Sequence, residues 1–263
     1  MSSLIKKYIK KYEHPVLAIA GVVLFLAVWS AISSVGKVPQ YVLPAPYAVV
    51  LSLYNLFATG TIYPHLVFSG QEFFLGYGVA LICGVSLGLL LGWYRRVNYL
   101  LEAVVSALYS TPRIAFIPLL LIVFGVMGIL KTAATVFLMA FFPILMNTIV
   151  GVRLCEASYV MVGKALGARD FQLIRDVVIP GAIPSIVTGL RLGVGLGLTG
   201  LVVGDLYGAQ AGLGFLLYLY GNSFRIADMM AVIIVFSIAG IIGNAALKKV
   251  ESWFSVWKPS TVG

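Results

Sequence analysis

Six stretches of about 20 residues, nearly free of charged side chains, constrain this chain more than any other feature. They lie at 16–36, 73–94, 103–130, 132–152, 184–204 and 229–247, and Arg113 and Arg191 are the only charged residues inside them. Hydrocarbon offers backbone amides no partners, so a segment that crosses a bilayer forms its hydrogen bonds within a helix of about 20 apolar residues. The pattern predicts an all-α membrane protein with six transmembrane helices in a single domain, 1–263.

The composition agrees with a lipid environment. Hydrophobic residues make up 61% of the chain and charged residues 10%, whereas soluble domains carry about 25% charged residues. The net charge of +9 would suggest nucleic acid for a soluble protein, but the basic residues here stand between apolar blocks rather than on one folded face. We therefore expect the lipid bilayer, and no nucleic acid, as a partner. Because 16–36 is longer than the apolar core of a signal peptide, about 7–15 residues, we expect an uncleaved first span.

The distribution of Lys and Arg predicts the orientation. With the N-terminus in the cytoplasm, 13 of the 18 basic residues fall in inner segments, and only Lys37, Lys131 and Arg225 fall outside. Cytoplasmic flanks are enriched in these residues, so we predict a multi-pass protein of the cell (inner) membrane with both termini cytoplasmic. The glycine-rich segment 206–224 is expected to be a re-entrant element or a loop with a short helix, since a seventh span would move the C-terminal lysines outside.

Glycine spacing predicts which helices pack closely. Small residues recur every four positions in the second span and in the fifth: Gly76, Ala80, Gly84, Gly88 and Gly92, then Gly189, Gly193 and Gly197. Small residues at this spacing let helix backbones approach each other in a membrane. We expect both spans to lie at helix interfaces.

The sequence offers little material for catalysis. The chain contains two histidines, His14 and His65, and two cysteines, Cys83 and Cys155, and none of them has metal-ligand spacing. Segment 195–200 fits the pattern G-x-G-x-x-G, but it stands in the middle of a span rather than between a strand and a helix. We expect no catalytic residue, no metal and no cofactor bound by this chain.

The longest predicted cytoplasmic connection, 153–183, is charged where its surroundings are apolar. It is interpreted as two short helices around Gly167, at a position suited to a left-handed cap. Asp170 stands near the start of the second helix, where free amides and the helix dipole favour a carboxylate.

In the second short helix, Phe171, Ile174 and Val178 make an apolar stripe, and Pro180 is expected to end the helix. A helix on lipid headgroups usually has a basic polar face, whereas this one also carries acidic residues. A protein partner is therefore favoured over the membrane surface.

This connection resembles the EAA loop of binding-protein-dependent ABC importer permeases, whose pattern is E-A-A, three residues, G, nine residues, I-x-L-P. Gly167, Val177, Ile179 and Pro180 fit that spacing, whereas Met161 stands where the family has glutamate. Further segments are similar to the nitrate, sulfonate, taurine and bicarbonate branch of the family: Leu43-Pro44-Ala-Pro46, Pro64-His65-Leu66, Leu87-Gly88, Ile117-Pro118-Leu119-Leu120, Phe141-Phe-Pro143-Ile-Leu-Met-Asn147-Thr148, Gly189-Leu190-Arg191 and Gly212-Leu-Gly214-Phe.

The resemblance implies a type I ABC importer permease with six spans. Such a permease pairs with a second copy, here a homodimer, with two cytoplasmic ABC ATPase subunits that bind ATP and Mg, and with an extracytoplasmic solute-binding protein. The residues that it implies for coupling to the ATPase are Leu166, Gly167, Ala168, Arg169, Asp170, Phe171, Ile174 and Pro180.

Three residues are candidates for the substrate path. A charged residue within a span is costly and suggests a functional site, so we expect Arg113 to line the path and attract a small anionic solute. Arg191 would serve an inner gate or an ion pair, and Asn147 is the third candidate.

Other functions stay open at this point. A small heterocyclic or vitamin-precursor solute is the alternative within the family, and an ATP-independent channel is the alternative outside it. A channel would conduct without ATP and leaves the 153–183 connection unexplained. A membrane enzyme would need a cluster such as Asp205, Arg225 and Asp228, for which a loop salt bridge is the simpler expectation.

Overall fold

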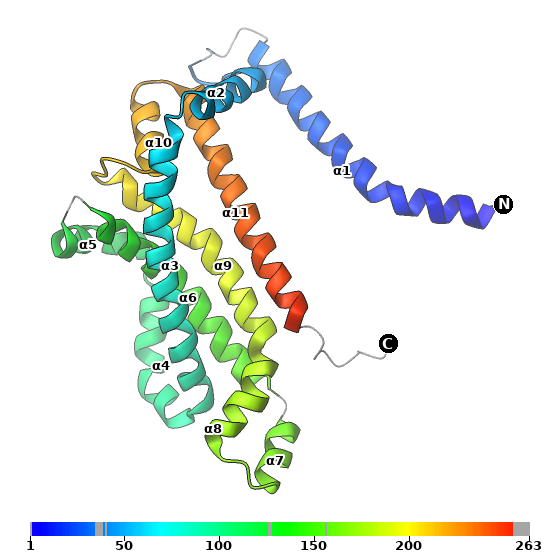
Figure 1. Ribbon diagram of the computed structural model, residues 1–263, viewed down its shortest axis with the longest axis vertical. Coiled ribbons are helices and arrows are strands. Elements are labelled where there is room, and N and C mark those ends of the chain that lie inside the picture. Colours follow the sequence, from blue (N-terminus) through cyan, green and yellow to red (C-terminus); the bar gives the residue numbers. More distant parts are fainter. Residues whose placement is uncertain (1, 35–38, 40, 126–127, 156, 255–263) are drawn as a thin grey trace. The chain divides into compact units, whose positions relative to one another are not determined.

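The computed structural model describes residues 2–34, 39, 41–125, 128–155 and 157–254, and every regular element among them is a helix (Figure 1). The chain divides into two compact units, which are described separately. Unit 1 comprises Met1–Thr61 and Leu219–Ile233, and unit 2 comprises Ile62–Tyr218 and Ile234–Gly263. Helices α10 (Leu213–Asn222) and α11 (Ile226–Phe254) each begin in one unit and end in the other.

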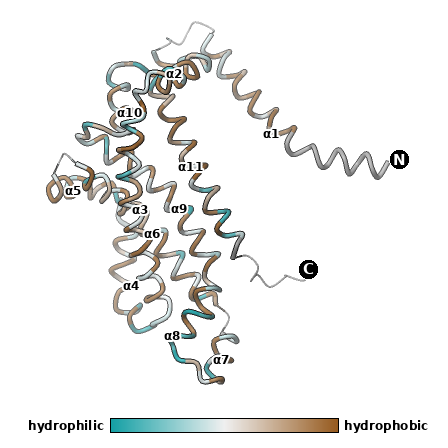
Figure 2. Tube along the Cα trace, in the orientation of Figure 1, coloured by the Kyte–Doolittle hydropathy of each residue, from teal (hydrophilic) through white to brown (hydrophobic). Residues whose placement is uncertain are grey.

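Five helical segments are long and apolar enough to cross a membrane. They are Val16–Ser34 within α1 (Ser2–Ser34), α3 (Ile62–Trp93), α6 (Ile129–Arg153), Asp170–Leu206, and Ile226–Ser252 within α11. Figure 2 shows apolar colouring along most of the first and last of these. A bent pair of helices brings the number to six, which confirms the expected all-helical membrane fold.

The expected third span, 103–130, is not one continuous helix. Helix α4 (Arg95–Ser110) and a second part formed by η1 (Arg113–Phe116) and α5 (Ile117–Phe124) meet at 93°. Pro112 has no N–H to continue the helix, and it forces the preceding Thr111 into an extended conformation with ψ 136°. The break therefore follows from the proline, and it places Arg113 at the bend.

Helix α6 forms the centre of unit 2, between α3 and α9 (Ile179–Leu206). A Cβ added to Gly88 of α3 would lie 2.5 Å from Cβ of Thr148, and one added to Gly189 of α9 would lie 2.7 Å from Cβ of Asn147. Only glycine allows these approaches, so the prediction that the second and fifth spans lie at helix interfaces is confirmed.

In unit 1, the short helix α2 (Pro46–Ala58) follows α1, and Trp29 Nε1 donates a hydrogen bond to the carbonyl of Pro44 at 3.0 Å. The glycine-rich segment after α9 is a loop followed by the ten-residue helix α10. Phe224, between α10 and α11, has a positive φ of 55°.

Candidate functional site

The connection 153–183 contains the expected turn. Helix α7 (Ala157–Ala165) is followed by a turn at Gly167, whose φ is +80°. The amide of Ala168 donates to the carbonyl of Gly163 at 3.0 Å, and the amide of Gly167 donates to the carbonyl of Lys164, also at 3.0 Å. This pair of bonds is the Schellman arrangement, which requires a left-handed residue and therefore favours glycine.

The second short helix, α8 (Asp170–Leu173), packs against α7 through a residue that the apolar stripe did not include. Leu173 is 1% exposed, and its Cδ2 lies 2.5 Å from where a Cβ of Gly163 would be. Leu166 and Phe171 are 82% and 74% exposed. The two short helices thus hold each other through Leu173 and present two large apolar side chains outward.

Pro180 does not end the helix, contrary to expectation. A π-helical turn, Ile174–Val178, joins α8 to α9, and Pro180 lies in the first turn of α9. The helix is continuous from Asp170 to Leu206. A π turn widens the helix by one residue and relieves the clash between a proline ring and the preceding turn, so the proline is accommodated without a break.

Arg113 lies between two aromatic rings at the bend before α5. Its guanidinium carbon is 5.4 Å from the ring centroid of Tyr109 and 5.6 Å from that of Phe142. Its Nε is buried and has no hydrogen-bond partner among the described residues. The rings stabilise the cation without neutralising its charge.

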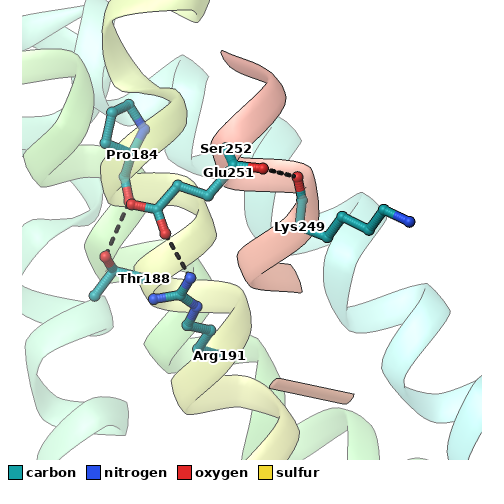
Figure 3. A network of polar contacts seen from close by, with 6 residues as sticks. All are labelled: Pro184, Thr188, Arg191, Lys249, Glu251 and Ser252. Carbon is teal, nitrogen blue, oxygen red and sulfur yellow. Dashed lines mark hydrogen bonds and ion pairs between the residues drawn. The ribbon is translucent and has the colours of Figure 1, made fainter. Parts of the chain in front are cut away.

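Arg191 forms an ion pair with Glu251 of α11. Arg191 Nη2 lies 2.5 Å from Glu251 Oε2, and the two side chains are 32% and 24% exposed. Figure 3 shows these two side chains pointing toward one another across the helices. The ion pair is one of the two roles expected for Arg191, and it joins α9 to the C-terminal part of α11.

Asn147 has a local partner. Its Nδ2 donates to the carbonyl of Pro143 one turn earlier at 2.8 Å, and its Cβ faces Gly189. Within the described part of the chain, no hydrogen bond or ion pair joins Asn147, Arg113 and Arg191 to one another. The structure therefore does not gather the three path candidates into one cluster.

A group of buried charged residues, missed by sequence reasoning, lies where α3, α6 and α9 meet. Glu72, Lys131 and Asp205 are 0%, 1% and 2% exposed. Asp205 accepts hydrogen bonds from the Thr132 hydroxyl and the Gly214 amide, each at 3.1 Å. Lys131 is the basic residue of this polar cluster and stands as the counter-charge to its two acids.

The polar cluster holds the loop that precedes α10. Lys131 Nζ donates to the carbonyl of Tyr207 at 2.8 Å, the Gly212 amide donates to His65 Nδ1 at 3.1 Å, and the Leu213 amide donates to Ser69 Oγ at 2.7 Å. Lys131 is therefore buried in the protein, at the start of α6.

One signal in the sequence could have revealed the polar cluster. Glu72 lies in α3, which begins at Ile62 and not at the predicted 73. His65, Ser69 and Glu72 are spaced four and three residues apart and share one face of the helix. A charge at that position is a functional or structural signal in a membrane helix.

Asp205, Arg225 and Asp228, the three residues that a membrane enzyme would have needed as one cluster, do not form one. Arg225 Nε donates to Asp228 Oδ2 at 2.7 Å, as expected for a loop salt bridge, whereas Asp205 belongs to the polar cluster. A search of the described residues finds no group of three or more His, Cys, Asp or Glu side chains that could hold a metal ion.

Comparison with known proteins identifies the family. The model of the binding-protein-dependent transport system inner membrane component family matches residues 80–255. The putative aliphatic sulfonates transport permease protein of Bacillus subtilis (strain 168) is 30% identical over 240 residues, which cover 91% of this chain and 87% of that protein. The formylaminopyrimidine transport permease protein of Halalkalibacterium halodurans is 32% identical over 218 residues, which cover 83% of this chain and 86% of that protein.

A solved structure supports the fold. The MetNI methionine ABC transporter in an inward-facing conformation matches with a TM-score of 0.61 and 20% identity, over 73% of this chain and 94% of the matched chain. The expected family resemblance is thus confirmed. The chain is an integral membrane protein and belongs to the family of inner membrane components of binding-protein-dependent transport systems.

Proposed function

We propose that this chain forms the translocation path of an ATP-driven importer for a small anionic solute, delivered by an extracytoplasmic binding protein. Two copies of the chain form the path as a homodimer in the cell (inner) membrane, with both termini cytoplasmic. Two ATPase subunits bind ATP and Mg, and this chain binds no cofactor of its own. The observation that carries the proposal is the exposed pair Leu166 and Phe171 beside the Gly167 turn.

The geometry of the connection suits mechanical coupling. Leu166 and Phe171 are two large, exposed apolar side chains on an otherwise charged connection, which suits a surface that a partner covers. A cleft on the ATPase that receives them would move α8, and the continuous helix from Asp170 to Leu206 would carry that movement into the membrane. Because the helix is unbroken, displacement of α8 acts on the α6 and α9 seam directly.

The anionic solute class rests on Arg113. The guanidinium is held by two rings and has a buried Nε without a partner, so it keeps its positive charge available. An anion that passes the bend between α4 and α5 would meet this charge at membrane depth, where electrostatic attraction is stronger than in water.

A small heterocyclic solute is the second candidate within the family. It is favoured by the similarity to the formylaminopyrimidine transport permease. In that case Tyr109 and Phe142, rather than the charge of Arg113, would contact the solute. Arg113→Gln separates the two: uptake of an anion would fall at least tenfold, whereas uptake of a neutral heterocycle would stay within a factor of about two.

The coupling role is tested by Phe171→Ala. Burial of a large side chain contributes about 1.5–3 kcal/mol, so its loss would weaken ATPase association about tenfold or more. Phe74→Ala is the matched control, because Phe74 is 75% exposed on α3 and Phe171 is 74% exposed on α8. The measurements are copurification with the ATPase and ATP-driven uptake in vesicles. Equal association for both variants and the parent would refute the proposed contact.

Gly167→Val tests the turn itself. Valine does not adopt a φ of +80° without strain, so the angle between α7 and α8 would change. We expect a chain that inserts and dimerises but loses substrate-stimulated ATP hydrolysis. Conduction that continues without any ATPase, in the parent or in this variant, would favour the ATP-independent channel.

A further inference from the structure

Unit 1 contains a pocket of about 280 Å³ that is separate from the polar cluster and from the coupling connection. It lies between the end of α2 and the turn that joins α10 to α11. Its lining residues are Asn55, Leu56, Thr59, Thr61, Tyr220, Arg225 and Asp228. All of them belong to unit 1, and all but Leu56 and Tyr220 are fully polar or charged.

Arg225 is held in a fixed orientation at this pocket. Its guanidinium carbon lies 4.7 Å from the ring centroid of Tyr220, and its Nε donates to Asp228 Oδ2 at 2.7 Å. The stacking and the single bond through Nε leave the two terminal nitrogens without a partner among the described residues. Those nitrogens form the planar fork that matches a two-oxygen anionic group.

The backbone before Arg225 is also constrained. The Phe224 amide donates to the carbonyl of Gly221 at 3.2 Å, and the Arg225 amide donates to the carbonyl of Tyr220 at 2.9 Å. This arrangement places Phe224 at φ 55°, where glycine is preferred. The two bonds are the Schellman arrangement that ends α10, and they determine where the backbone of Arg225 stands.

Arg225 is the one basic residue among the residues that line the pocket, and Asp228 is the one acid. Asp228 already accepts from Arg225 and stands in the first turn of α11, where the helix dipole offsets its charge. On the α2 side, the Thr59 hydroxyl donates to the carbonyl of Asn55 at 2.7 Å and lies 2.9 Å from the Thr61 hydroxyl, so these two hydroxyls are already hydrogen-bonded within the pocket wall. We propose that this pocket binds the anionic group of a small sulfonate or carboxylate, with Arg225 as the residue that recognises it.

Within the proposed function, this site receives the solute on the outer side of the membrane, where the predicted topology places both α2 and Arg225. That physiological role rests on the proposed function. Binding of an anion by the pocket does not rest on the proposed function, because it requires neither the ATPase nor the binding protein. The proposed function and the proposed binding site can therefore fail separately.

The test is direct binding to the purified full chain in lipid nanodiscs, measured by calorimetry. Methanesulfonate is the probe, and dimethyl sulfone is its uncharged counterpart of nearly the same shape. We expect saturable binding of methanesulfonate, binding of dimethyl sulfone at least tenfold weaker, and no binding of methylammonium.

Arg225→Gln should weaken methanesulfonate binding at least tenfold, and Arg225→Lys should restore only part of it, since lysine keeps the charge but lacks the fork. Arg95→Gln, which removes an exposed arginine at the start of α4, should leave binding unchanged. If Arg225→Gln does not fold, Tyr220→Leu serves instead, since it removes the ring that orients Arg225.

Equal binding of methanesulfonate and dimethyl sulfone, unchanged binding by the Arg225 and Tyr220 variants, or absence of saturable binding to the parent would each overturn the proposal. If the parent chain binds methanesulfonate but shows no ATP-driven uptake when its ATPase and binding protein are present, the proposed function is refuted and the proposed binding pocket stands.

Discussion

Phe224 illustrates how much one backbone angle can matter at the residue scale. Among the described residues it is the non-glycine residue with a positive φ, and its ring makes an edge contact with Tyr41 at 6.5 Å between centroids. The left-handed conformation costs roughly 1–2 kcal/mol for a residue with a Cβ. We expect Phe224→Gly to be more stable than Phe224→Ala by about 1 kcal/mol, because both remove the ring but only glycine removes the strain. Thermal unfolding in one detergent compares the two directly, and equal midpoints would contradict the argument.

The buried Lys131 is expected to contribute to the stability of the folded protein. Lys131→Met removes the donor to the Tyr207 carbonyl and the counter-charge of Glu72 and Asp205. An unpaired buried acceptor costs about 1–3 kcal/mol, and the isolated carboxylates add to that. We expect the unfolding midpoint to fall, and to recover in part in the double variant with Asp205→Asn, since the second change removes one uncompensated charge.

Lys131→Met, Asp205→Asn and the double variant form a double-mutant cycle. Its control is Lys248→Met, which removes a cation from the C-terminal part of α11 and leaves the polar cluster unchanged. Strict additivity of Lys131→Met and Asp205→Asn would show that the two side chains do not interact, and it would remove Lys131 from its role as counter-charge.

At the scale of elements, the contact between α3 and α6 depends on the absence of single Cβ atoms. Gly88 faces Thr148, whereas Gly78, on the same helix, has nothing within 4 Å of its missing Cβ. Alanine is favoured over glycine in a helix by about 1 kcal/mol, so Gly78→Ala should be neutral or stabilising. Gly88→Ala should destabilise by about 1–3 kcal/mol, as overpacking does. Both variants make the same chemical change on the same helix, so Gly78→Ala is the control for Gly88→Ala. Equal effects of the two on the unfolding midpoint would mean that α3 and α6 are not closely packed at Gly88.

At the scale of the whole molecule, the orientation in the membrane is the central expectation. With the protein's own cysteines replaced, Lys164→Cys should react with an impermeant reagent only after the membrane is opened. Ser223→Cys, between α10 and α11, should react in intact cells. The expectation follows from the 13 to 3 distribution of basic residues. Strong labelling at 164 together with none at 223 in intact cells would reverse the proposed topology.

Local patterns determined much of this protein. The uncharged stretches predicted an all-helical membrane fold, the glycine spacing predicted the seams of α3 and α9 with α6, and Gly167 predicted the turn between two short helices. The motif spacing indicated the family that the comparisons then identified. These properties follow from neighbouring residues, because hydropathy, helical periodicity and left-handed caps are all properties of short segments.

Only the tertiary structure decided which polar residues meet. Glu72, Lys131 and Asp205 belong to three helices that are distant in sequence, so their common burial depends on packing and not on any local pattern. Pro180 was expected to end a helix, but a π turn accommodates it. Whether a buried charge is tolerated, or a proline breaks a helix, depends on the partners and space that other elements supply, and a single sequence does not encode those distances locally.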